Sequence, residues 1–161
     1  MLGNDVAFGV LESTKEKDFD FKASDLLKIE EQYIVDCTAI LKKCPEAIKY
    51  LKHQPYELCK IAIKESKGVA LKYIRNQTAE LCLEAVKDSG LNLAFVKEPT
   101  YEICKEAVKQ DGMALRYVKS QTDELCLIAV TQNGRALMYV EEPTRILCVT
   151  ALQQIDSVNR W

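Results

Sequence analysis

The sequence predicts an all-α protein: an α-solenoid of short two-helix repeats of about 22 residues, preceded by a non-repeat N-terminal arm. Three observations carry this prediction. One pattern recurs four times in succession, at residues 56–78, 79–100, 101–122 and 123–144. Within each copy the apolar residues follow a helical period. Glycine and threonine stand where short helices are expected to end and begin.

Each copy predicts two helices. In the first, Leu81, Cys82 and Ala85 share one helical face, and in the second the stretch 114–118 repeats this arrangement. The glycines between the two helices are expected to adopt the left-handed conformation that ends a helix: Gly90, Gly112 and Gly134. The threonines that close each copy are expected to be N-caps: Thr78, Thr100, Thr122 and Thr144.

Helices of about two turns are marginal alone, so neighbouring repeats must stack and share a core. A second period lies over the first, because copies 56–78 and 101–122 close with Gln–Thr, whereas 79–100 and 123–144 close with Pro–Thr. This alternation indicates that a pair of repeats was duplicated. A one-residue insertion near Lys67 interrupts the spacing.

The flanks of the repeats set the expected domain boundaries. Residues 1–24 do not repeat and form an arm that either caps the first repeat or carries binding specificity. Residues 25–161 form the repeat domain, with a degenerate repeat near 34–55 in which Pro45 replaces glycine. Residues 145–161 form a capping repeat, with Asp156 at the glycine position and Trp161 at the aromatic position.

Composition and charge bound the class of protein. The chain has 161 residues, 48% of them hydrophobic and 29% charged, with a net charge of −2. No apolar run is long enough to span a membrane, so we expect a cytoplasmic protein in a reducing compartment. The charge is uneven: residues 1–36 hold nine acidic and four basic side chains, and residues 37–120 hold ten and fifteen.

Catalytic, metal and cofactor sites are not expected. Six of the seven cysteines recur at one repeat position, which favours small buried side chains over disulfides or a metal site. His53, the single histidine, has no serine or carboxylate partner at a recognisable spacing. The recurring aromatic position, Tyr50 to Trp161, is expected to lie in the core with its hydroxyl groups at the rim.

The outer face of the second helices is the predicted partner-binding surface. Basic residues recur there at two repeat positions, and apolar residues begin the same helices, so stacking would produce a basic ridge with apolar anchors. This basic ridge comprises Lys49, Lys52, Lys72, Arg75, Lys97, Arg116 and Lys119, with Leu91, Met113 and Met138 beside it. A solvated face of long side chains is the alternative interpretation.

Residues 34–155 resemble a family of short tandem helical repeats, catalogued only as a domain of unknown function, on the Ala–Val, Gly, Ala–Leu and Tyr–Val pattern. The resemblance implies a solenoid fold and a place among bacterial, phage, giant-virus and protist proteins. It names no activity. A small stand-alone copy in such company would suit an inhibitor of a host or defence protein. The expected function is therefore a non-enzymatic protein-binding module, with nucleic-acid or anionic-ligand binding and self-assembly as alternatives.

Overall fold

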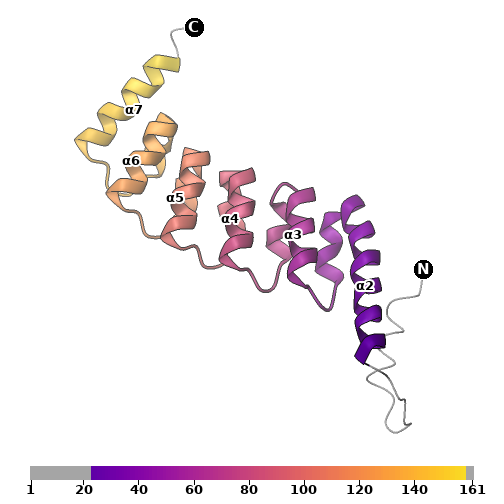
Figure 1. The fold of residues 1–161 in the computed structure, drawn as a ribbon. Coiled ribbons are helices and arrows are strands. Elements are labelled where there is room, and N and C mark those ends of the chain that lie inside the picture. The colour runs from indigo at the N-terminus through magenta and orange to yellow at the C-terminus, as the bar shows by residue number, and fades with distance from the viewer. Residues whose placement is uncertain (1–22, 159–161) are drawn as a thin grey trace.

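Two kinds of helix alternate along the chain in a computed structural model, which describes the main chain of residues 23–158 and the side chains of residues 31–155 (Figure 1). From α2 to α6, each α-helix is followed by a 3₁₀ helix. The described elements are α2 (Ala23–Lys43), η1 (Pro45–Tyr50), α3 (Tyr56–Glu65), η2 (Val69–Tyr73), α4 (Ala79–Asp88), η3 (Gly90–Phe95), α5 (Tyr101–Gln110), η4 (Gly112–Tyr117), α6 (Asp123–Gln132), η5 (Gly134–Tyr139) and α7 (Arg145–Val158). The predicted all-α solenoid is confirmed.

The α-helices lie side by side from α2 to α7, with the two ends of the stack far apart (Figure 1). Each packs against the α-helices before and after it and against the neighbouring 3₁₀ helices. The apolar positions predicted from the period are buried: Leu81 and Cys82 are 1% and 3% exposed, and Ala85 and Val86 are fully buried. One continuous core therefore runs through all the repeats.

The second element of each repeat is a 3₁₀ helix, so the expected α-helical period is wrong there. Its hydrogen bonds join residues three apart, as in Val118 N to Leu115 O at 3.0 Å. With three residues per turn, residues i and i+3 share one side. Met113 and Arg116 therefore stand together on the outer side, while Ala114 and Leu115 are fully buried.

The four threonine caps are confirmed. The hydroxyl oxygen of Thr78 accepts from Leu81 N at 3.3 Å, and Thr100, Thr122 and Thr144 make the same bond in their own repeats.

The predicted left-handed glycines at positions 90, 112 and 134 are wrong, because their φ angles are not positive. Each lies instead where the next repeat approaches closely. A Cβ atom on Gly112 would lie 2.3 Å from Ala129 O, and one on Gly134 would lie 2.7 Å from Ala151 O. Glycine is needed here because a neighbouring main chain fills the space of a side chain.

The one-residue insertion produces the left-handed backbone that the other repeats lack. Lys67 and Gly68 have φ angles of 53° and 86°. The turn leaves Lys67 O facing the next repeat, where the buried Asn92 side chain donates to it at 2.9 Å and to Ala85 O at 2.8 Å. Asn92 replaces the buried alanine of the other repeats, so insertion and substitution form one local arrangement.

The two ends differ from the internal repeats. Helix α2 has 21 residues and runs without a break past position 34, where the first repeat was predicted to start. Helix α7 continues through Asp156, so the turn predicted there is wrong. Of the arm predicted at residues 1–24, Ala23 and Ser24 belong to α2. Residues 1–22 lie outside the described residues, as do Asn159, Arg160 and Trp161. None of the described helices is long and apolar enough to cross a membrane.

Candidate partner-binding surface

Three basic side chains of the predicted ridge lie over aromatic rings of the 3₁₀ helices. Lys49 Nζ is 4.7 Å from the ring centre of Tyr50 and 5.4 Å from that of Tyr73. Lys72 Nζ lies 4.7 Å from Tyr73 and 5.9 Å from Phe95. In both cases the lysine bridges the ring of its own repeat and the ring of the next one. The ring faces attract the ammonium groups and favour these positions of the two lysine side chains.

Arg116 continues this row two repeats further on. Its guanidinium carbon lies 4.6 Å from the ring centre of Tyr117. The intervening position is Ala94, and the position after Arg116 is Met138, which is 72% exposed. The row therefore consists of two adjacent cations, a gap, a third cation and an exposed apolar side chain.

The rings under these cations are less buried than expected. Tyr73, Phe95, Tyr117 and Tyr139 are half-buried, and Tyr50 is 76% exposed. The prediction of a core ladder is therefore wrong for Tyr50, because η1 has no preceding 3₁₀ helix among the described residues to cover it.

Two other basic side chains are used within the solenoid. Arg75 donates to Lys52 O at 2.6 Å and to Leu51 O at 3.1 Å, at the end of the preceding 3₁₀ helix. Lys97 donates to Ile74 O and Arg75 O at 3.2 and 2.9 Å. Cations suit such terminal carbonyl groups. Both side chains therefore join successive repeats, a role that sequence reasoning missed.

The remaining predicted residues divide by exposure. Lys52 and Lys119 are exposed, whereas Leu91 and Met113 are half-buried. Of the ten predicted residues, the structure brings Lys49, Lys72 and Arg116 into one kind of arrangement, each over an aromatic ring.

Glutamines before the caps form a further inter-repeat contact that sequence reasoning missed. Gln77 Nε2 donates to Leu71 O and to Phe95 O, both at 2.9 Å, and its Oε1 accepts from Lys97 N at 2.9 Å. Gln54 and Gln121 bind the following repeat in the same way. The Gln–Thr and Pro–Thr alternation was the available signal, because Pro99 and Pro143 have no side-chain amide.

A second polar cluster lies on the outer side of the α-helices. Glu124 accepts from Tyr101 at 2.5 Å and pairs with Lys105 at 2.8 Å. Lys105, then Tyr101, lowers the pKa of the Glu124 carboxyl below its ordinary value. This cluster joins α5 to α6 on the exposed surface.

Five of the six repeat cysteines are buried. Cys82, Cys104 and Cys126 are buried, as predicted, and all seven thiols are free. Burial raises the pKa of the Cys59 thiol to about 11 and also raises that of Cys82. Within the described residues, no group of His, Cys, Asp and Glu side chains could hold a metal ion.

Comparisons with known proteins agree with the repeat. Neither the curated proteins nor the solved structures gave a match. One family model matches the chain twice, over residues 78–122 and 100–143, so that the second match starts one repeat after the first. Over these residues the chain is similar to a tandem-repeat family described as Domain of unknown function (DUF4116).

Proposed function

We propose that this protein is a non-enzymatic binding module that holds an acidic or mixed surface of one partner protein against its 3₁₀-helix face. The observation that carries the proposal is the row of exposed cations held over aromatic rings, at Lys49, Lys72 and Arg116. Flexible lysines lose side-chain entropy on binding. A cationic side chain that already lies over a ring loses less side-chain entropy when a partner binds.

The arrangement of the row supports a protein partner over a uniform polyanion. Among the described residues the row of cations is interrupted at Ala94 and at the exposed Met138, and at the neighbouring repeat position, which holds Lys97 and Lys119, Glu141 reverses the charge. A phosphate backbone favours an unbroken basic track and a basic protein, whereas this chain has a net charge of −2. A protein surface that offers both carboxylates and an apolar side chain suits the mixed row better.

A charge-reversal experiment tests the proposal. The tagged protein is used to capture partners from the cells in which it occurs, with and without nuclease. The test variant carries Lys49→Glu, Lys72→Glu and Arg116→Glu. The control variant carries Lys64→Glu, Lys87→Glu and Lys109→Glu, three exposed lysines in the last turns of α3, α4 and α5. Both variants change the net charge equally, and neither touches Arg75 or Lys97.

We expect the control variant to retain one stoichiometric protein partner and the test variant to lose it, while both keep the circular dichroism of the native protein. Equal retention by both variants would place the site elsewhere. Recovery that disappears with nuclease would instead support nucleic-acid binding on the same row. An inhibitor role in a phage or viral setting rests on the family resemblance alone, and the activity of the captured partner would test it.

A further inference from the structure

The row of cations on the 3₁₀-helix face has one gap inside the stack, at Ala94, which is exposed. A lysine at this position would bridge the rings of Phe95 and Tyr117, as the lysines one and two repeats earlier bridge their own pairs of rings. An alanine side chain ends at Cβ and forms no such bridge. We call Ala94 with these two half-buried rings the aromatic gap. Described repeats enclose it, because η3 packs on both η2 and η4.

The charges around the aromatic gap favour an aromatic side chain of the partner over a cation. Aromatic rings pair with one another at centroid distances of about 4.5–7 Å, and cations also bind ring faces. A cation in the gap would lie between Lys72 and Arg116, one repeat away on either side, and like charges repel. None of the described cations of the row stands between two others. A neutral ring packs on Phe95 and Tyr117 without this repulsion.

The spacing of the repeats sets the spacing of the partner's side chains. The helices η2, η3 and η4 pack on one another in succession, and packed helices lie about 8–10 Å apart. A chain in the polyproline II conformation has about three residues per turn, so every third side chain points the same way, about 9 Å further on. One side chain in each turn therefore meets one repeat. A bound α-helix would need a continuous apolar groove, whereas this row is charged on both sides of the gap.

We propose that the 3₁₀-helix face binds an extended acidic segment of its partner in the polyproline II conformation, with an aromatic residue in the aromatic gap. Carboxylates one turn before and one turn after that residue pair with Lys72 and Arg116, which are both exposed. The segment therefore has the pattern acid–x–x–aromatic–x–x–acid. This inference rests on the proposed function, because it assigns the partner's side chains to the same row of cations.

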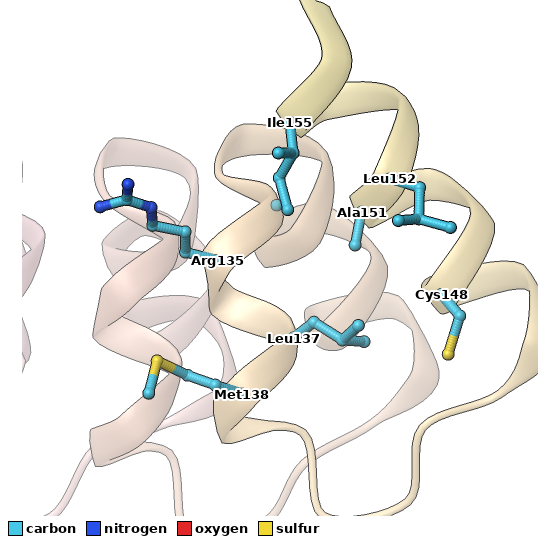
Figure 2. A pocket seen from close by; sticks show the side chains of 8 residues that line it. Arg135, Leu137, Met138, Cys148, Ala151, Leu152 and Ile155 are labelled. Atoms are coloured by element: carbon cyan, nitrogen blue, oxygen red, sulfur yellow. The ribbon is translucent and has the colours of Figure 1, made fainter. Parts of the chain in front are cut away.

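The positions beyond this pattern differ at its two ends. Lys49 stands one repeat before Lys72 and provides a further cation for a second acidic residue. Met138 follows Arg116 and also lines an apolar groove between η5 and α7 (Figure 2). Residues 159–161, which follow α7, lie outside the described part of the chain. The proposed contacts therefore end at Arg116 and do not include the groove.

Fluorescent peptides titrated with the full chain test the proposal by fluorescence anisotropy. The matched peptide has the pattern Glu–x–x–Glu–x–x–Phe–x–x–Glu–x–x–Glu, with proline in each spacer to favour the polyproline II conformation and prevent a helix. This pattern reads the same from either end, so it fits either chain direction. The control peptide has the same composition with its glutamates adjacent. Since an exposed ion pair contributes up to about fivefold in affinity, we expect the matched peptide to bind about tenfold more tightly.

A substitution in the aromatic gap locates the bound peptide. Ala94→Lys gives this repeat the residue that stands at the same position in η1 and η2. The wild-type protein should prefer the matched peptide about fivefold over one with glutamate at its centre, because ring faces are negative. Ala94→Lys should reverse this preference. The matched control, Thr131→Lys, adds the same charge at an exposed position where earlier repeats carry Lys87 and Lys109, and it should keep the wild-type preference.

Equal affinity for the matched and control peptides, or no binding of either, would refute the proposal. Tighter binding of a peptide with lysine at its centre would also refute it, because the gap would then hold a cation. A preference that Ala94→Lys leaves unchanged would place the peptide elsewhere and contradict the assignment of the gap. If the wild-type protein captures a partner that the charge-reversal variant loses, but discriminates none of the peptides, the proposed function stands and this inference fails.

Discussion

The close approach at Gly112 predicts that a single methyl group destabilises the solenoid. In Gly112→Ala the new Cβ would lie 2.3 Å from Ala129 O and 2.9 Å from Gln132 Oε1. The main-chain carbonyl cannot move without shifting α6. Overpacking of this kind costs about 1–3 kcal/mol. The shift would also weaken the bond from Gly112 N to Gln132 Oε1, now 2.6 Å long, which adds about 0.5–1.5 kcal/mol.

One effect opposes this cost. Alanine restricts the unfolded chain more than glycine does, which stabilises the folded state by about 0.4–1 kcal/mol. We therefore expect a net loss of about 2 kcal/mol in the free energy of unfolding. For a chain of this size, that corresponds to a fall in Tm of about 4–8 °C. Thermal melts followed by circular dichroism measure it.

Two further variants separate close approach from left-handed geometry. Gly112→Asn should be at least as damaging as Gly112→Ala, whereas a left-handed position would tolerate asparagine. Gly134→Ala should cost less, because its Cβ would lie 2.7 Å from Ala151 O. A Gly112→Ala protein that melts at or above the wild-type temperature would refute the reasoning.

Three further predictions follow from other contacts between repeats. Asn92→Ala should lower the free energy of unfolding in urea by about 2–3 kcal/mol, because two carbonyl groups lose their donor. Deletion of Lys67 in the same chain should restore most of the lost stability. Equal destabilisation in the double variant would disprove the link between Asn92 and the insertion. Gln77→Ala should also lower the free energy of unfolding by about 2–3 kcal/mol, because three hydrogen bonds are lost. Gln77→Glu should destabilise the protein more above pH 5 than below pH 4, since a carboxylate would face two carbonyl oxygens. A pH-independent effect of Gln77→Glu would contradict this reasoning. Burial raises the pKa of the Cys59 thiol from 9.0 to about 11, so this thiol should lower the free energy of unfolding by about 1.4 kcal/mol per pH unit as the pH rises from 9 to 11. Cys59→Ala should make that slope shallower without abolishing it, because burial also raises the pKa of Cys37, Cys82, Cys104 and Cys126.

Features that repeat within one copy could be predicted from the sequence. The Thr78 cap and the burial of Cys82 each depend on contacts a few residues away, and local spacing reveals such contacts. Gly112 and Gln77 depend on contacts with the next repeat, 17 and 18 residues on. The same glycine could serve a left-handed turn or a close approach, and only the packed neighbour distinguishes the two.

The candidate site was predictable in part for the same reason. The row of Lys49, Lys72 and Arg116 follows from the repeat, and so does the aromatic row beneath it. No pattern in the sequence indicates that Arg75 and Lys97 bind main-chain carbonyl groups, because equally spaced lysines and arginines look alike whether they face solvent or a helix end. The asparagine at position 92 was the clearest available anomaly: a polar residue at a core position, one repeat after an insertion.

The hydrogen bonds between successive repeats explain which cations are available to a partner. At Gln54 and Gln77 the glutamine amide accepts from the main-chain N–H of Arg75 and Lys97, and those same residues donate their side chains to the preceding repeat. The charged side chains of Arg75 and Lys97 therefore stabilise the stacking of successive repeats. Pro99 stands at the corresponding place before Lys119 and provides no such amide. A partner that binds the 3₁₀-helix face would meet Lys119 and the ring-held cations, while Arg75 and Lys97 keep the repeats in register beneath it.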